Sequence, residues 1–367
     1  MIKFVCLFVC LLEGIVWAYP EMTRHGYVNC ISCHVSPTGG GILTEYGREL
    51  SRELLSSTGK EEESKFVYGV VKPPQWLNLG GDLRSLLLFR DTPTLKEGKV
   101  ILMQADLEAI ASYKKILLGG TFGYKQTRGS QPLKEHLISR RHYLNYRPLK
   151  DKNDELSFRG GKFQPAFGIN IPDHAVSTKR GLGWDQGSET YNMEASWIGE
   201  KLNAYITGIF GRPDDKKLNR EKGGAVSSSI SFLDRFRAGV SYFYGKNDLA
   251  KRHVVGPFGI LGFTEKLSLL SEWDFQGKIP KGSHNTRWGF VNYQKLDYEL
   301  LQGFHGFLTQ EFSKLDFSKP KSLDKVFGVG MQYFPRPHFE LSLTYQWLAQ
   351  SGSKENTDLF FLFHFYP

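Results

Sequence analysis

The sequence predicts an all-β fold, in which about 16 antiparallel strands close into a transmembrane β-barrel behind a small N-terminal α-helical and loop unit. Two observations predict this class. Apolar and polar residues alternate over segments of about 9–13 residues, which are longer than ordinary strands and suit strands that cross a membrane at a tilt. Aromatic residues make up 14% of the chain and glycines number 39 in 367, a composition typical of barrels in which only every second residue faces lipid.

Residues 1–18 have the features of a secretory signal peptide. A basic start is followed by a short apolar run, and the small residue Ala18 precedes Tyr19. The run is shorter than the about 20 residues that a membrane-spanning helix needs, although an uncleaved apolar anchor is the alternative interpretation. Cleavage would remove Cys6 and Cys10. The mature chain would then keep only two cysteines, too few for a disulfide-stabilised scaffold.

Residues 19–75 form the predicted N-terminal unit. Apolar residues at three-to-four spacing predict a short amphipathic helix over 43–56, which Thr44 or a glycine before it can cap. The stretch "STGKEEESK" after it is predicted to be a solvated, charged linker. The unit ends at "VVKPPQW", because two prolines interrupt any regular element.

Residues 76–367 carry the alternating pattern of the predicted barrel. The pattern is clearest in "FELSLTYQW", residues 339–347, where apolar and aromatic side chains fall on one face and polar ones on the other. "FLDRF", "GFTEK" and "FPRPHF" are predicted short turns, whereas "NIPDHAVSTKRGLGWDQG" and "GRPDDKKLNREKGG" are predicted longer loops. A soluble β-sandwich or a β-helix is the alternative, but the strands of a sandwich would be shorter and the sequence shows no fixed short repeat of a β-helix. The predicted strands are 79–90, 99–113, 115–128, 136–148, 155–164, 188–199, 201–211, 225–234, 236–245, 251–262, 265–277, 284–295, 299–313, 324–335, 338–349 and 357–366.

Cys30 and Cys33 stand three residues apart in "NCISCH", and His34 follows directly. This C-x-x-C-H pattern is the attachment signature of a c-type haem. Two thiols at this spacing can form thioethers with one porphyrin, while the imidazole that follows binds its iron. We therefore predict one covalent haem c, with Cys30 and Cys33 as the thioether attachment residues and His34 as the proximal iron ligand.

Three other interpretations of the motif remain open. A Cys30–Cys33 disulfide would close a small, strained loop. A zinc site would need two more ligands nearby, where the unit offers only His25. A thioredoxin-like redox pair would need a βαβ surround, which the pattern lacks. Export of the chain favours the haem, because this cofactor is attached outside the cytoplasm.

The second axial ligand of the predicted haem is not fixed by the motif. No methionine lies between His34 and Met103, where a small cytochrome usually supplies one. His25, five residues before Cys30, is the nearest candidate distal ligand. Met22, a barrel residue or an open position are the alternatives. A histidine in place of a methionine would lower the reduction potential.

The combination of a signal peptide, one C-x-x-C-H unit and a barrel of about sixteen strands resembles the fused cytochrome–porins of bacterial outer membranes, such as the iron-oxidising outer-membrane cytochromes. The resemblance covers the whole chain and rests mainly on "NCISCH". It implies an electron-transfer protein of the outer membrane, whose haem unit lies in the periplasm or in the barrel lumen. It also implies two kinds of partner, a periplasmic cytochrome or other redox carrier and an extracellular electron donor or acceptor, with ferrous iron as one candidate.

A second, weaker resemblance lies inside the barrel. "FRGGKFQPAFGINIP", 158–172, is similar to the "GKF-x-P-x-FG" stretch of phosphate- and anion-selective porins. Together with a net charge of +9, it supports the alternative function, an anion-type porin whose haem-bearing unit acts as a plug or sensor. Alternation along the strands nominates Arg140, Arg141 and Arg237 as inward cations that could neutralise haem propionates.

No motif of a conventional enzyme is present in the sequence, which contains no nucleophile elbow, phosphate loop or metal-hydrolase signature. We also expect no nucleic-acid partner. Many porins trimerise, so an oligomer is possible, although no segment marks a subunit interface. A haem-handling outer-membrane protein without electron transfer is a third functional interpretation.

Overall fold

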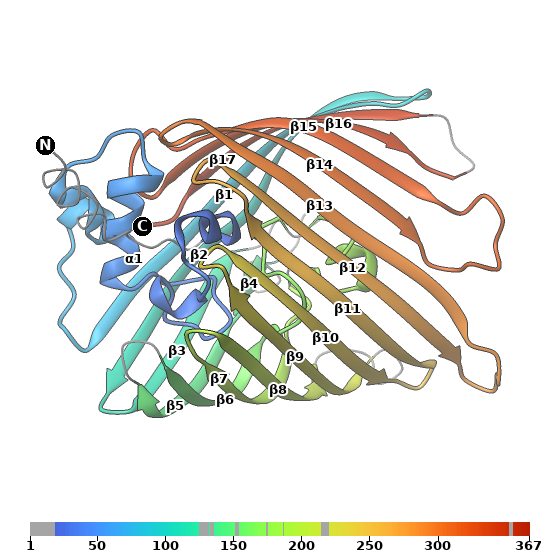
Figure 1. Ribbon diagram of the computed structural model, residues 1–367, viewed down its shortest axis with the longest axis horizontal. Coiled ribbons are helices and arrows are strands. Elements are labelled where there is room, and N and C mark those ends of the chain that lie inside the picture. Colours follow the sequence, from blue (N-terminus) through green and yellow to red (C-terminus); the bar gives the residue numbers. More distant parts are fainter. Residues whose placement is uncertain are drawn as a thin grey trace, which may run out of the picture.

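The computed structural model describes residues 19–124, 132, 136–150, 154–173, 175–185, 187–213, 220–351 and 355–367. The predicted signal peptide, 1–18, lies outside them. The described strands form one antiparallel sheet that closes on itself, because β1 pairs with both β2 and β17 (Figure 1). β4 and β5 both pair with β3 and share one place in the wall, so the seventeen strands make a 16-stranded barrel.

The strand positions confirm the period-two analysis of the sequence, with shifts of up to six residues at the ends. Residues 125–128 of one predicted strand lie outside the described part of the chain. The strands are β1 (Leu77–Asp91), β2 (Lys96–Tyr113), β3 (Ile116–Tyr124), β4 (Leu137–Ile138), β5 (His142–Lys150), β6 (Glu155–Phe163), β7 (Thr190–Ile198), β8 (Leu202–Gly211), β9 (Lys222–Phe232), β10 (Phe236–Lys246), β11 (Ala250–Gly262), β12 (Leu267–Pro280), β13 (Arg287–Leu301), β14 (Phe304–Lys314), β15 (Asp324–Tyr333), β16 (Phe339–Ala349) and β17 (Asn356–Phe365).

Side chains alternate between the outer surface and the interior of the barrel as predicted. On β8, Ile206 is 64% exposed and Phe210 is 53% exposed, whereas Asn203 and Thr207 on the other face are buried. The outer surface is therefore apolar and the interior is polar, the arrangement of a barrel that stands in lipid. Among the described residues, no helix is long and apolar enough to cross a membrane.

The two ends of the barrel differ in their connections. Short turns join the strands at the end where the chain leaves the N-terminal unit; the β9–β10 turn, for example, contains Leu233 and Asp234 in left-handed conformations that close a tight hairpin. The predicted short turns "GFTEK" and "FPRPHF" lie at this end too. Longer connections follow β6 and β8 at the opposite end.

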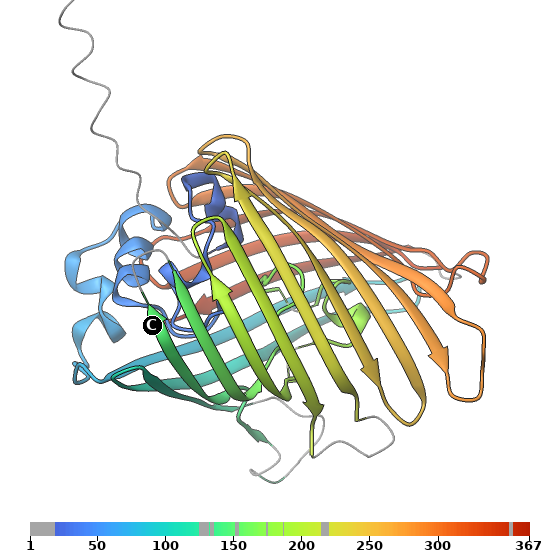
Figure 2. The ribbon, with the colours of Figure 1, turned by 60° about the horizontal axis from the view of Figure 1, so that its bottom comes forward.

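Residues 19–75 lie across the mouth of the barrel at the short-turn end, and we call this segment the plug (Figures 1 and 2). Its elements are η1 (Pro20–His25), η2 (Cys30–Ser32), α1 (Glu45–Leu50), η3 (Ser51–Leu55), η4 (Glu61–Ser64) and η5 (Phe66–Gly69). The predicted helix over 43–56 is present as α1 continued by the π-helical turn η3, and the Thr44 hydroxyl accepts the predicted capping hydrogen bond from the Gly47 N–H at 3.0 Å.

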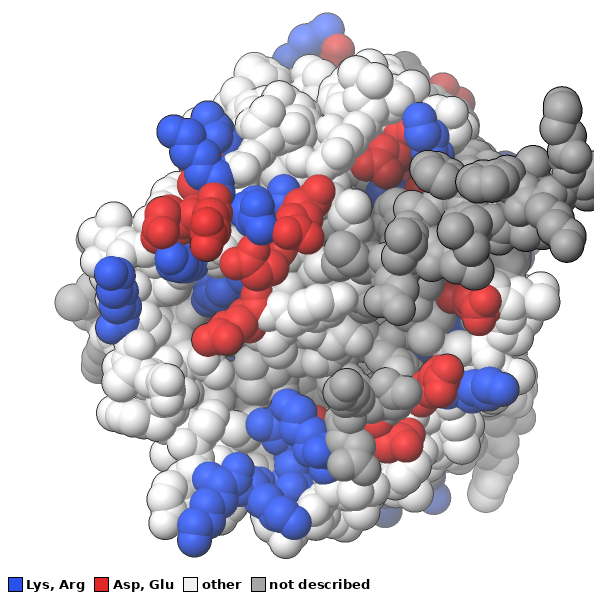
Figure 3. Space-filling view, turned by 60° about the vertical axis from the view of Figure 1, so that its left-hand side comes forward, with Lys and Arg blue, Asp and Glu red and all other residues white. Residues whose placement is uncertain are grey.

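The stretch predicted to be a solvated linker is tied to the structure. Ser64 is buried and its hydroxyl donates to Glu49 at 2.6 Å, while Glu63 pairs with Arg336 of the β15–β16 turn. The solvated interpretation was therefore wrong for this half of the segment. Its outer side remains charged: Figure 3, which turns the plug end forward, shows a band of acidic side chains flanked by basic ones, and Glu45, Glu53, Glu61 and Glu62 of the plug are exposed.

Polar contacts on several sides of the lumen hold the plug. Arg24 is fully buried and pairs with Asp297 of β13 at 2.7 Å. Further hydrogen bonds join plug to wall from Arg237 of β10 to the Val28 carbonyl (2.9 Å), from Tyr205 of β8 to the Pro37 carbonyl (3.1 Å), from Arg159 of β6 to Ser36 (3.1 Å) and from Lys295 of β13 to Glu21 (2.6 Å). The plug is thus fixed inside the barrel mouth and does not hang from it on a linker.

Candidate functional site

The cysteine motif forms a single 3₁₀ turn inside the plug. The backbone N–H groups of Cys33 and His34 both donate to the Cys30 carbonyl, at 3.3 and 2.9 Å. No disulfide joins the two cysteines of this turn. Cys33 is 1% exposed, and this burial, with the nearby Cys30, raises the pKa of its thiol. No cluster of three or more potential metal-ligating side chains occurs in the described part of the chain, so the zinc interpretation gains no ligands.

His34 is oriented by the glycine loop that follows it. Its Nδ1 lies 3.3 Å from the Gly41 carbonyl oxygen, and a β-bridge to Leu43 closes the loop. Gly41 has a φ of +67°, which favours glycine, and a Cβ there would lie 2.6 Å from a Glu108 oxygen. A metal-binding histidine commonly donates its other ring N–H to a backbone carbonyl, which fixes the tautomer and the ring plane.

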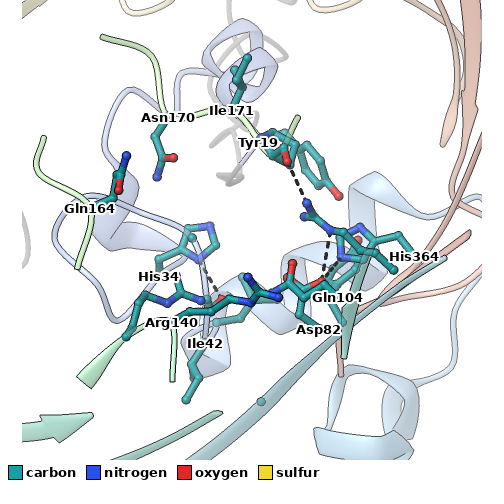
Figure 4. A pocket seen from close by; sticks show the side chains of 18 of the residues that line it. Tyr19, His34, Ile42, Asp82, Gln104, Arg140, Gln164, Asn170, Ile171 and His364 are labelled. Atoms are coloured by element: carbon teal, nitrogen blue, oxygen red, sulfur yellow. Dashed lines mark hydrogen bonds and ion pairs between the residues drawn. The ribbon is translucent and has the colours of Figure 1, made fainter. Parts of the chain in front are cut away.

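Two cavities inside the lumen meet at His34. The larger is about 290 Å³ and the smaller, which Cys30 also lines, is about 110 Å³. Figure 4 shows the His34 ring projecting into the open space of the larger cavity. The residues that line both cavities are Tyr19, Pro20, His34, Gly40, Gln164, Asn170 and Lys179. The motif therefore faces an internal space bounded by plug and barrel together.

The three arginines nominated by alternation all lie at these cavities. Arg140 and Arg141 line the larger one, and Arg237 lines the smaller one. Alternation alone could not place two consecutive residues inward. The predicted strand 136–148 is broken into β4 and β5, and in the break the backbone N–H groups of Arg140 and Arg141 both donate to the Thr121 hydroxyl, at 2.8 and 2.9 Å. This irregularity lets both guanidinium groups reach the lumen.

Two of the three inward arginines already have carboxylate neighbours. Arg140 pairs with Asp106 at 2.8 Å, and Arg141 pairs with Glu108, both on β2. Arg84, also on the wall of the larger cavity, lies 3.2 Å from Asp82. The cavity wall thus carries fixed positive charge in a balanced ionic network.

The connection between β6 and β7 contributes the far wall of the cavities. It leaves the wall after Phe163, at the porin-like stretch 158–172, and folds into the lumen (Figure 2). Ile169 and Leu182 are 2% exposed and pack against wall residues in two separate apolar clusters, and the Ile169 N–H donates to Glu272 of β12 at 2.7 Å. Sequence analysis predicted a longer loop but not its inward course. The apolar residues within the loop were the available signal; they are Phe167, Ile169, Ile171, Val176, Leu182 and Trp184.

The two candidate distal ligands from the plug lie away from the cavities. The Nε2 of His25 accepts from Arg24 at 3.3 Å and lies 3.8 Å from Glu299 of β13. Met22 is 2% exposed and packs in the apolar cluster that contains Cys33. Neither residue lines the space that His34 faces. The structure brings Cys30, Cys33 and His34 together and does not bring His25 or Met22 to the open side of His34.

The residues present fit a covalently attached haem. The turn holds Cys30 and the oriented imidazole of His34 at the cavities, while Cys33 is buried in the adjoining apolar cluster of the plug. The glycine loop lies against Cys30, where a Cβ on Gly39 would stand 3.2 Å from the sulfur, and arginines line the space that the imidazole faces. Cys30 and Cys33 would hold the porphyrin, and His34 would bind the iron. The arginines could neutralise propionates.

Comparisons with known proteins bear on the barrel alone. No protein-family model and no curated protein sequence matches the chain. Among solved structures, a loop-deletion mutant of the outer-membrane protein OmpT of Vibrio cholerae matches with a TM-score of 0.62 at 10% identity, over 79% of this chain and 99% of that one. The anion-selective porin of Comamonas acidovorans matches with 0.59 at 10%, over 79% and 99%. Salmonella typhi OmpF in complex with daunomycin matches with 0.56 at 13%, over 79% and 97%. The chain therefore has the 16-stranded fold of outer-membrane porins.

Proposed function

We propose that this chain is an electron-transfer protein of the bacterial outer membrane, with one c-type haem attached to Cys30 and Cys33 of the plug. The observation that carries the proposal is the placement of the C-x-x-C-H turn within the barrel mouth, with the His34 ring in an internal cavity. The bound haem would supply a one-electron redox centre. The chain's own contribution is to orient His34 through Gly41 and to surround the centre with charge-balanced arginines.

The barrel gives this centre a location that a soluble protein could not. The hydrocarbon core of a bilayer is about 30 Å thick, and a soluble redox carrier does not cross it. A centre in the lumen shortens the distance that separates reactants on the two sides. Buried contacts such as Arg24–Asp297 hold the plug across the barrel mouth. In the proposed function, electrons would therefore pass through the barrel while ions would not.

Short turns face the periplasm in outer-membrane barrels, which orients the plug toward the periplasm. The partner on that side would be a periplasmic cytochrome or another redox carrier. The exposed glutamates of the plug, such as Glu45 and Glu53, favour a carrier with a basic face. The partner beyond the opposite end would be an extracellular electron donor or acceptor, with ferrous iron as the first to test.

A second function, an anion-type porin whose plug acts as a gate or sensor, is favoured by the fold. One of the similar structures is an anion-selective porin, and another is described as a trimer form of OmpT. The stretch 158–172 and the inward arginines are compatible with anion passage. In this function the plug would have to leave the lumen for the pore to conduct, and a trimer would be the expected assembly.

Haem attachment tests the first function at its first step. Mature protein from outer-membrane fractions should carry one covalent haem, visible by haem stain and by intact mass. Cys33→Ala should lose one thioether and most of the stain, whereas Thr38→Ala, a change in the same loop outside the motif, should keep it. A mature wild-type protein without haem would overturn the electron-transfer proposal and leave the porin.

A further inference from the structure

We propose that the iron ligand opposite His34 is the α-amino group of Tyr19, which exists only after the signal peptide has been cleaved at Ala18. The inference rests on the proposed haem and names a group that no side-chain motif reveals. The redox centre would then be complete only after the chain has been exported and its signal peptide removed.

The placement of the first mature residues is the starting observation. Tyr19 and Pro20 line both cavities together with His34, so the beginning of the mature chain borders the space that the imidazole faces (Figure 4). η1 starts at Pro20, and the Tyr19 carbonyl accepts its first hydrogen bond, from the Met22 N–H at 2.8 Å. The predicted cleavage would thus leave an amine on a residue that borders the candidate haem site.

Tyr19 is anchored by every group other than that amine. Its hydroxyl donates to Glu340 of β16 at 3.2 Å. Its ring meets Phe334 edge-on, with the centroids 5.4 Å apart, and packs against the apolar cluster that contains Cys33. The hydroxyl, ring and carbonyl of Tyr19 thus already have partners, and the α-amine of the mature residue is the remaining polar group that could bind iron. A ligand held this firmly loses little freedom when it binds.

The other nitrogen donors on the cavity walls are less suited. His364 lies 2.8 Å from Glu340 through Nδ1 and 3.2 Å from Asp82 through Nε2, so both ring nitrogens face carboxylates. Lys179 is the remaining rival, and its Nζ makes a 3.5 Å hydrogen bond to the Phe167 carbonyl. An α-amine is a weaker base than a lysine amine by more than two pKa units, so near neutral pH its lone pair is available at lower cost.

Isotope labelling of the intact haem protein separates these donors. The protein is made with ¹⁵N-tyrosine or with ¹⁵N-lysine, and pulsed EPR of the oxidised haem reports which nitrogen binds the iron. Intact mass first establishes that the mature chain begins at Tyr19. We expect a strong iron-bound ¹⁵N coupling in the tyrosine-labelled protein alone, because a backbone amide of any other tyrosine cannot bind iron.

Two variants sharpen the result. One added alanine before Tyr19 moves the amine by about 3.8 Å, so it should abolish the ¹⁵N coupling and shift the optical spectrum. Lys179→Met should leave both unchanged. Coupling in the lysine-labelled protein, no coupling with either label, or a different mature N-terminus would overturn the inference while the haem proposal stands. Absence of haem from the wild-type protein would overturn both.

Discussion

Replacement of Arg24 by methionine is expected to loosen the plug from the barrel. Arg24 has no exposed surface, and its guanidinium pairs with Asp297 at 2.7 Å and with Glu299 at 3.2 Å. Methionine keeps much of the side-chain length and removes the charge. The change therefore leaves two carboxylates in the interior of the barrel mouth with fewer partners.

The magnitude follows from the partners that remain. Breaking a buried ion pair by removing one side costs about 3–5 kcal/mol. Asp297 keeps His305 at 3.0 Å and Lys295 at 3.8 Å, so the lower end applies. A cost of about 3 kcal/mol corresponds to a rise on the order of 10² in the population of undocked plug.

Limited trypsin digestion of vesicle-reconstituted protein measures that population. The cleavage rate of the plug tracks the open fraction when reclosing is fast. Arg336→Met is the matched control, because Arg336 also joins barrel to plug, 3.2 Å from Glu63, but its side chain is 48% exposed. Such a surface pair contributes about 0–1 kcal/mol, so its loss should raise the rate at most about fivefold. Equal rates for the two variants would refute the reasoning that buried pairs hold the plug.

Three further predictions concern the loop, the interface and the wall. Gly41→Ala places a side chain at a φ of +67°, so it should lower the free energy of unfolding by about 2 kcal/mol and reduce the haem content of the protein. Gly120→Ala has open space around it and should change neither quantity; equal effects of the two variants would exclude the strain argument. Burial and nearby positive charge lower the pKa of His338 to about 3. An unfolded histidine titrates near 6.5, so as the pH falls below this value the unfolded chain binds a proton that the folded chain does not. The free energy of unfolding should therefore fall by about 2 kcal/mol between pH 6.5 and 5. His338→Gln should flatten this pH dependence, and an unchanged dependence would contradict the prediction. In urea titrations of protein in vesicles, Ile206→Arg in the middle of β8 should destabilise the barrel by about 2–4 kcal/mol, and Leu202→Arg at the end of the strand by about 0–1 kcal/mol. The reverse order would show that the lipid-facing band does not lie at the middle of β8.

The sequence was most informative where physical constraints repeat along the chain. A strand in lipid must alternate, so the two faces of β16 were predicted from its sequence. A covalent motif needs fixed spacing, so Cys30, Cys33 and His34 could be named as a candidate site from the sequence.

The rest depended on contacts between distant segments. The break that turns Arg140 and Arg141 inward arises from Thr121 on a neighbouring strand, which no local pattern encodes. The inward fold of the loop after β6 depends on Glu272, about a hundred residues later. His25 was nominated by its nearness in sequence to Cys30, but Glu299 on the barrel wall lies beside it.

Electron transfer across a sealed membrane tests the central claim most directly. Haem-loaded protein is reconstituted into vesicles that enclose an oxidised acceptor, and ferrous iron is added outside. The proposed function predicts reduction of the enclosed acceptor without ion leak, and no reduction with Cys30→Ala/Cys33→Ala protein. Ion conductance in the haem-loaded protein with no reduction of the acceptor would contradict it and identify the chain as a pore.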